Sequence, residues 1–303
     1  MKLFTKSLSI TRNYSGPIRA CILDWSGTVS DKYVIAPAKT FIKAFSLKGI
    51  EVSMEQARKP MGIRKDLHIA EMAKEFDIIK QWENQYGRPI TEEDIQNIYE
   101  DFVPLQLECL DQYSKLIPQV GETIQYLQSN KKIKFGSTTG FTRDMVDILN
   151  NSAEKQGLFL DSTVAGDEVE TGCRPKPHML YKNLDLLDIH PIKAVVKIDD
   201  TASGIGEGLN AGCWTVGVSR YSNYMNIDSF EHEKTLTEKE LSKRNIQSGN
   251  KLHRAGAHFV IDSIADLPAI IDEINNRLKR GIEPNPHRPK KNLPYADLPD
   301  LKI

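Results

Sequence analysis

The sequence predicts an α/β protein: a doubly wound parallel sheet with a helical domain inserted after its first strand. Short apolar runs alternate with segments of helical periodicity between residues 114 and 280. Residues 36–113, in contrast, contain several helix-like segments and almost no strand pattern. We therefore expect an N-terminal arm at 1–18, a core formed by 19–35 and 114–280, a helical insertion (the cap) at 36–113, and a proline-rich tail at 281–303.

Composition excludes several classes of protein. The chain has 303 residues, 40% of them hydrophobic and 27% charged, and a formal net charge of −1, which gives no indication of nucleic acid as a partner. No apolar run approaches the roughly 20 residues that span a bilayer, so no membrane association is expected.

The four cysteines form no CxxC pair, which argues against a zinc site or a disulfide framework. Cys21 and Cys213 lie in apolar runs and indicate a reducing, cytoplasmic location. The first 18 positions have basic residues and no acid, as a transit peptide has, but their sparse apolar positions favour a plain arm over a targeting segment.

The first strand is expected to end at a carboxylate. Cys21-Ile22-Leu23 is a short apolar run, and Asp24 follows it directly. Ligands of open parallel sheets bind at the carboxyl ends of the strands, where Asp24 would lie. Gly27 and Thr28 follow closely, and we expect their backbone N–H groups and the threonine hydroxyl to suit an anion such as phosphate.

Three helices are expected in the cap. One begins at Ala36-Pro37 and ends at Gly49, and another begins at the N-cap Thr91 and is interrupted at Pro104. A third is expected to begin at Pro60, because proline suits a first helical turn. This helix would place three side chains on one face, at i, i+4 and i+7: Met61, Lys65 and His68.

The core is expected to alternate helices and strands after residue 120. Residues 221–254 are polar and weakly patterned, and the sequence assigns no element or role to them. Helices are expected at 121–129, from 142, from 177, at 202–211 and at 264–278, and strands at 132–137, 162–165, 194–198, 213–218 and 258–261.

Four polar features follow strands of this sheet or lie in its loops, and we expect them to converge at one edge. They are Asp24, Thr139, Arg174 and the pair Asp199-Asp200. Two carboxylates and a backbone carbonyl are hard oxygen ligands that suit Mg²⁺. Thr139 and Arg174 can bind the remaining oxygens of a phosphoryl group, and one carboxylate can attack phosphorus to form an aspartyl-phosphate.

This ordered set resembles the haloacid dehalogenase superfamily. The segment Asp24-Trp25-Ser26-Gly27-Thr28, together with Lys59-Pro60-Met61-Gly62, is similar to its phosphonatase branch. The resemblance implies cleavage of the P–C bond of a small phosphonate, phosphonoacetaldehyde, by a Mg²⁺-dependent homodimer. It assigns catalysis to Asp24, Lys65 and His68, substrate binding to Met61, Thr139, Gly140, Arg174 and Thr28, and the metal to Asp24, Ser26 and Asp200.

The chemistry of a P–C bond explains the need for a lysine. Carbon would otherwise leave as an unstabilised carbanion, whereas a Schiff base with the aldehyde makes the leaving group an enamine. The amine must first lose its proton, so the pKa of Lys65 has to fall from about 10.4 to about 7–8. Burial could lower it, with repulsion from Arg58, Lys59 and Arg64, which are close in sequence.

Several positions depart from the phosphonatase pattern. Ser26 stands where alanine is usual, and it also excludes the aspartate that most phosphatases of the superfamily use as general acid two residues after the nucleophile. Phe141 takes the place of a tyrosine, and Val34 that of a cysteine or serine. Asp199 replaces a residue that is usually glycine, and Gly204 replaces a second aspartate.

These departures leave two alternatives open. One is a phosphatase or phosphomutase that acts on another small phosphate, with Lys65 only binding the substrate. The other is a non-catalytic relative that binds a phosphorylated ligand.

Overall fold

The computed structural model describes residues 14–170 and 172–284. Within them, six strands form one parallel sheet in the order β3-β2-β1-β4-β5-β6. This confirms the predicted α/β class, a doubly wound parallel sheet. The strands are β1 (Ala20–Leu23), β2 (Lys134–Thr138), β3 (Ser162–Val164), β4 (Val195–Asp199), β5 (Trp214–Val218) and β6 (Phe259–Ile261).

Helices cover both faces of the sheet, which explains why the central strands read as continuous apolar runs. In β1, Ala20 and Ile22 pack with apolar residues of α8 and α9, whereas Cys21 and Leu23 belong to the large cluster that includes α6, α7 and α12. The core helices are α6 (Val120–Lys131), α7 (Arg143–Lys155), α8 (His178–Leu187), α9 (Ala202–Ala211), α10 (Phe230–Thr235), α11 (Glu238–Arg254) and α12 (Leu267–Lys279).

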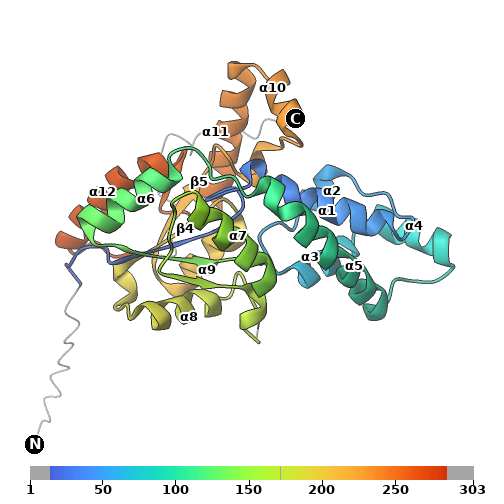
Figure 1. Cartoon of the computed structure of the whole chain (residues 1–303), viewed down its shortest axis with the longest axis horizontal. Helices are drawn as coiled ribbons and strands as arrows, with labels where there is room; N and C mark the ends of the chain where they lie inside the picture. The colour runs from blue at the N-terminus through green and yellow to red at the C-terminus, as the bar shows by residue number, and fades with distance from the viewer. Residues whose placement is uncertain (1–13, 171, 285–303) are drawn as a thin grey trace, which may run out of the picture.

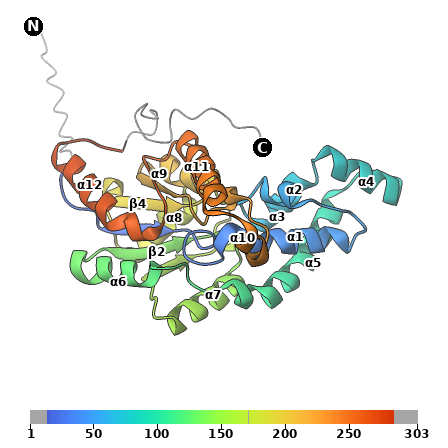
Figure 2. The ribbon, with the colours of Figure 1, turned by 90° about the horizontal axis from the view of Figure 1, so that it is seen from above.

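The cap helices gather at one end of the molecule, to the right in Figures 1 and 2. Their interior is aromatic: the rings of Phe41 and Phe102 stack with centroids 4.4 Å apart, and Trp82 and Ile98 are buried. The helices are α1 (Ile35–Ser46), α2 (Met54–Arg58), α3 (Lys65–Met72), α4 (Phe76–Tyr86) and α5 (Glu92–Leu110).

Short 3-10 helices join several of these elements. They are η1 (Lys32–Val34), η2 (Asp111–Tyr113), η3 (Gly166–Glu168), η4 (Ile192–Ala194), η5 (Asn223–Met225) and η6 (Ile264–Asp266).

Two predictions about the cap helices are wrong. No helix begins at Pro60: α2 ends at Arg58, and Gly62 has a φ of 98°, which a helix does not accommodate. Met61 therefore lies in a loop, and only Lys65 and His68 share α3. Pro104 does not interrupt α5, because it is exposed and water can bind the carbonyl that proline leaves without a donor.

Residues 221–254, to which the sequence assigned no element, contain η5, α10 and α11. The buried face of α11 includes Ser248, Gly249 and Asn250, so it carries little of the apolar periodicity that marks a helix in sequence.

Most of the predicted arm and tail lies outside the described residues. Among the helices of the described chain, none has the length and apolar character needed to cross a bilayer.

Candidate active site

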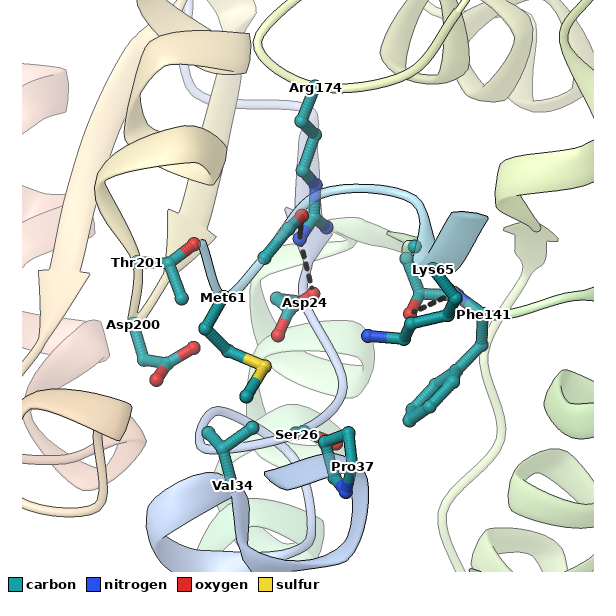
Figure 3. Close-up of a pocket in the computed structure, with 13 residues that line it drawn as sticks. Asp24, Ser26, Val34, Pro37, Met61, Lys65, Phe141, Arg174, Asp200 and Thr201 are labelled. Atoms are coloured by element: carbon teal, nitrogen blue, oxygen red, sulfur yellow. Dashed lines mark hydrogen bonds and ion pairs between the residues drawn. The ribbon is translucent and has the colours of Figure 1, made fainter. Parts of the chain in front are cut away.

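A small cavity opens between the cap and the carboxyl edge of the sheet, where β1 and β4 lie side by side. The strand order changes direction here, and such a switch point is where ligands bind in open α/β sheets. The empty volume is about 290 Å³. Figure 3 shows that side chains reach it from both lobes. The lining residues are Asp24, Ser26, Val34, Pro37, Met61, Gly62, Lys65, Thr139, Gly140, Phe141, Arg174, Asp200 and Thr201.

Asp24 is held at the floor of this cavity by backbone and side-chain contacts. It follows β1 directly, and its N–H donates to the carbonyl of Ile198 over 3.0 Å. Its Oδ1 lies 2.7 Å from Nη1 of Arg174, and both side chains are buried. Burial raises the pKa of Asp24, and the Arg174 guanidinium opposes that effect. The ion pair thus favours the carboxylate form that a nucleophile requires.

Three carboxylates meet at this floor. Asp24, Asp199 and Asp200 each place an oxygen within 4.8 Å of the other two. Oδ2 of Asp200 accepts a hydrogen bond from the N–H of Asn223 at 2.7 Å, whereas its buried Oδ1 has no partner among the described residues. Burial and the two neighbouring carboxylates raise the pKa of Asp200 well above its ordinary value. A hard divalent cation such as Mg²⁺ fits this donor set, because it would relieve the repulsion and could bind the unpartnered oxygen.

Gly27 makes room for that carboxylate. Its φ is 82°, and a methyl group at this position would lie 2.5 Å from Oδ2 of Asp200. Its N–H donates to the carbonyls of Ser30 and Asp31, and the N–H of Thr28 donates to that of Trp25. The prediction that these two amides offer themselves to an anion is therefore wrong. Thr28 is buried and does not line the cavity.

Lys65 enters from the cap and extends toward Asp24 (Figure 3). It is the first residue of α3 and is only 5% exposed. Burial is the main cause that lowers its pKa to about 8, and Arg174 lowers it further while Asp24 raises it. The N-terminal position on α3 adds repulsion from the helix dipole. About a tenth of Lys65 is therefore a free amine at pH 7, far more than of an ordinary lysine.

The three cations that were expected to lower the pKa of Lys65 contact other groups instead. The guanidinium of Arg58 donates to backbone carbonyls of Tyr33 and Asn223, Arg64 pairs with Asp66, and exposed Lys59 pairs with Glu75. The cation that lowers the pKa of Lys65 is Arg174. This residue comes from the core and was predicted only as a phosphate ligand. Proximity in sequence was a poor guide because the loop between α2 and α3, where Gly62 has a φ of 98°, keeps these residues from sharing one helix face.

His68 lies beneath Lys65 and not on the cavity wall. Its Nε2 lies 2.9 Å from the carbonyl of Ala57, so this nitrogen carries the proton, and its ring stacks on Phe41 with centroids 3.8 Å apart. Nδ1 is buried without a partner among the described residues. Burial and the charge of Lys65 lower the pKa of His68 well below its ordinary value. The imidazole is therefore a neutral base with one free lone pair.

The cap is closed over the core in this structure. A methyl group at Gly140 would overlap the carbonyl oxygen of Ile63, so only glycine allows the two lobes to come this close. Across the same seam, the N–H of Arg64 donates to Sγ of Cys173 at 3.0 Å, and Nη1 of Arg174 donates to the carbonyl of Gly62 at 3.4 Å. Thr139 lines the cavity, and its Oγ1 accepts from the N–H of Phe141.

A fully buried polar network holds Arg174 from behind. Oε2 of Glu207 lies 3.1 Å from Nε of Arg174, 3.2 Å from Nζ of Lys197 and 2.8 Å from Oγ1 of Thr138. Sequence reasoning missed Lys197 and Glu207. The available signals were a lysine inside an apolar strand and a glutamate on a glycine-rich helix, since charges are seldom fully buried unless they are paired.

Comparison with known proteins identifies the family. The family model for haloacid dehalogenase-like hydrolases matches residues 18–212. A phosphonoacetaldehyde hydrolase of Syntrophobacter fumaroxidans is 38% identical over 94% of this chain and 100% of its own. A phosphonoacetaldehyde hydrolase-like protein of the same organism is 36% identical over the same shares. The crystal structure of a phosphonoacetaldehyde hydrolase-like protein from Oleispira antarctica matches with a TM-score of 0.86 and 39% identity, over 89% of this chain and 97% of that one.

The chain belongs to the phosphonoacetaldehyde hydrolase family. It is thus a hydrolase of the haloacid dehalogenase type, as its strand-end aspartates and the segment around Lys65 indicate.

Three departures from the family pattern lie on the cavity wall. Phe141 places its ring 4.5 Å from Nζ of Lys65, and Val34 adds a second apolar side chain. Val34 has a φ of 56°, an unusual conformation for a β-branched residue. Ser26 lines the cavity, and its Oγ has no partner among the residues described. Phe141 and Val34 therefore make the cavity wall more apolar than the family pattern implies, whereas Ser26 adds a hydroxyl group.

Proposed function

We propose that the protein hydrolyses the P–C bond of phosphonoacetaldehyde to acetaldehyde and phosphate, as the names of its relatives say of them. The observation that carries the proposal is the meeting of Lys65 and Asp24 on one small cavity, each supplied by a different lobe. A buried amine of lowered pKa suits attack on an aldehyde, and a carboxylate paired with Arg174 suits attack on phosphorus.

In the first step, Lys65 forms the Schiff base. Its neutral amine attacks the aldehyde carbon, and water leaves to give an imine that is protonated to the iminium. His68 can take up a proton at Nδ1, because its Nε2 proton is committed to Ala57 and its lowered pKa keeps the ring neutral beforehand. The ring lies off the cavity wall, so we assign it proton transfer with Lys65 and no contact with the phosphonate.

In the second step, Asp24 attacks phosphorus. The electron pair of the P–C bond moves to carbon, and the iminium nitrogen accepts it, so that an enamine leaves. Arg174 and Thr139 bind phosphoryl oxygens as negative charge builds up. Bound Mg²⁺, which Asp24, Asp200 and the Ser26 carbonyl would hold, supplies electrostatic stabilisation of that charge.

Hydrolysis then regenerates both groups. The enamine gains a proton at carbon, and water releases acetaldehyde from Lys65. Water also attacks the aspartyl-phosphate, which frees phosphate and the Asp24 carboxylate. The closed seam between Gly140 and Ile63 would keep water away until the enamine has formed.

Borohydride trapping tests this proposal. Incubation with phosphonoacetaldehyde and borohydride should give a reduced adduct on Lys65, detectable by peptide mass spectrometry. Lys65→Arg keeps the charge but cannot form an imine, so it should show neither an adduct nor phosphate release. Lys59→Arg is the matched control, since Lys59 is exposed in the neighbouring loop and should be replaceable without effect. Full phosphate release by Lys65→Arg would rule the mechanism out.

Phosphatase activity is the second candidate, and the cavity disfavours it. Among the described residues that line the cavity, the carboxyl groups are Asp24 and Asp200, which are assigned to the nucleophile and the metal. Ser26 offers a hydroxyl that is too weak an acid to protonate an alkoxide at neutral pH. Turnover of phosphate esters without a Lys65 adduct would support this candidate. Binding of phosphonate without any phosphate release would support a non-catalytic relative.

We also propose that the protein is a homodimer that pairs through its caps. Four large apolar side chains of the cap are exposed, and Phe76 is the most accessible at 68%. The others are Leu47, Leu67 and Tyr86. Light scattering should give twice the chain mass.

The four cysteines are free, which supports a reducing, cytoplasmic setting.

A further inference from the structure

The helix that carries Lys65 has no acceptor of its own for the N–H group of its N-cap. The N-cap is Arg64, whose extended backbone (φ −61°, ψ 143°) precedes α3 and whose side chain makes no capping hydrogen bond. In α2, the N–H of the N-cap Ser53 donates to the side chain of Gln56, three residues later, at 2.9 Å. The equivalent position of α3 is Leu67, which has no acceptor. The start of α3 therefore depends on a group from elsewhere in the chain.

The core supplies that group. The N–H of Arg64 donates to Sγ of Cys173 at 3.0 Å, across the seam between the lobes. Cys173 lies in the loop between β3 and α8, is 3% exposed and packs with apolar side chains of both elements. Its neighbour Arg174 donates from Nη1 to the carbonyl of Gly62 at 3.4 Å. Two consecutive residues of one core loop thus hold the segment that precedes Lys65.

A thiol suits this position because it is neutral. Burial raises the pKa of Cys173, so near neutral pH its sulfur accepts the hydrogen bond without carrying a negative charge. A carboxylate, a common partner of helix N-termini, would attract the ammonium of Lys65 and raise its pKa. Lys65 directly follows the anchored residue Arg64 and extends toward Asp24 (Figure 3). A displacement of Arg64 would therefore move the amine and admit water to it.

We propose that Cys173 is a positioning residue: its thiol caps α3 from the opposite lobe and thereby holds the Lys65 amine in its place facing Asp24. The inference rests on the Schiff-base role of Lys65 in the proposed function. Cys173 does not line the cavity, so we assign it no contact with the substrate. Its effect on the reaction passes through the placement and the pKa of Lys65 alone.

Two substitutions separate the hydrogen-bond acceptor from the packing. Cys173→Ala removes the acceptor, whereas Cys173→Ser keeps one in a side chain of similar size. The pKa of Lys65 can be measured on the full chain without substrate, from the pH dependence of its acetylation by acetic anhydride, followed by peptide mass spectrometry. This pKa should stay near 8 in the wild type and in Cys173→Ser, and rise toward 10.5 in Cys173→Ala. The kcat for phosphonoacetaldehyde should fall about tenfold in Cys173→Ala and at most about twofold in Cys173→Ser.

Cys109→Ala is the matched control. The thiol of Cys109 contacts Thr40 and Gln106 within the cap and does not line the cavity, so its loss should change neither the pKa of Lys65 nor kcat.

The outcomes separate this inference from the proposed reaction. An unchanged pKa of Lys65 in Cys173→Ala, with only a lower melting temperature, would show that Cys173 merely packs the core and would overturn the inference. Equal effects of the alanine and serine substitutions would overturn it as well. Because the pKa is measured without phosphonate, failure of the chain to cleave phosphonoacetaldehyde would refute the proposed function and leave this comparison decisive.

Discussion

At the scale of single residues, Lys65 illustrates how burial lowers the pKa of an amine. An ordinary lysine is almost wholly protonated at neutral pH, whereas Lys65 is enclosed by the aromatic rings of Phe41 and Phe141 and repelled by Arg174. Asp24 attracts its charge and limits the effect. The balance leaves a pKa of about 8, which is low enough to supply free amine and high enough to allow reprotonation.

The first prediction concerns the pH dependence of Schiff-base formation. Only the free amine attacks the aldehyde, so the rate of borohydride-trapped adduct should rise with pH and level off above the pKa of Lys65, about 8. Between pH 7 and pH 8 the free fraction should increase about fivefold. Single-turnover trapping across this range measures it. A rate that keeps rising to pH 10 would mean that Lys65 is not perturbed.

The second prediction is that Lys65 destabilises the fold. Its folded pKa, about 8, is lower than the 10.5 of an unperturbed lysine, so between these pH values the unfolded chain binds more protons and stability rises with pH. Below pH 8 the cost is about 3 kcal/mol. Lys65→Met should therefore raise the free energy of unfolding at pH 7, in urea titrations, by up to this amount.

The advantage of Lys65→Met should shrink as the pH rises from 8 to 10.5, because the free energy needed to remove the Lys65 proton of the unfolded chain on folding falls as the pH approaches 10.5. Lys59→Met, at an exposed site of the neighbouring loop, should change stability little at any pH. An unaltered or lower stability of Lys65→Met at pH 7 would contradict the argument.

At the scale of elements, the seam between the loop before α3 and the loop after β2 decides whether the two lobes can close. Gly140→Ala should hold them apart, since the added methyl group would overlap the carbonyl of Ile63. A displacement of about 1 Å can reduce turnover about 100-fold. We expect kcat/KM for phosphonoacetaldehyde to fall by about 10- to 100-fold, and the pKa of Lys65 from the trapping profile to rise toward 10.5.

Gly121→Ala is the matched control for this seam. It lies at the start of α6, where an added methyl group makes only ordinary contact with Leu116 at 3.8 Å. Its kinetics should match those of the wild type. Equal effects of the two substitutions would indicate that Gly140 does not control closure.

The elements that carry the site were largely predictable, because each strand of the core is an apolar run that ends where polar residues begin. Asp24 and Asp200 follow such runs, and their meeting required only the topology of a parallel sheet. The loop before α3 was not predictable in this way. Its course depends on the left-handed conformation of Gly62 and on contacts with Thr201 and Ser203 of the core, which are distant in sequence.

The side chains behind the site were harder still to predict. Lys197, in the middle of the apolar strand β4, argues against a buried strand in the sequence. Its burial is explained only by the ion pairs with Asp199 and Glu207. Likewise, Gly204 looked like a lost metal-site aspartate, and only the overlap with Asp199 links the two departures. Such pairs depend on distances between side chains, which periodicity does not encode.

At the scale of the whole molecule, one buried side chain joins the two lobes. Arg58 ends α2 of the cap and is 4% exposed. Its Nη1 donates to the carbonyl of Tyr33 at 2.6 Å and to that of Asn223 at 3.2 Å, and its Nη2 donates to the carbonyl of Ile227 at 2.6 Å. Asn223 returns a hydrogen bond from its side chain to the carbonyl of Arg58 at 3.1 Å. The cap is therefore anchored both to its own linker and to the loop after β5.

Arg58→Met should loosen this anchor, because it removes the donor from the buried carbonyls of Tyr33 and Ile227 and leaves that of Asn223 with only the N–H of Asn226. The free energy of unfolding in urea should fall by about 3 kcal/mol. Hydrogen exchange should accelerate most in α1 and α2, next to the lost anchor, while the central strands of the core keep their protection. Lys59→Met, one residue further along and exposed, supplies the comparison. Uniform loss of protection throughout the sheet would mean that Arg58 stabilises the core itself, and the view of Arg58 as the link between two separately packed lobes would have to be abandoned.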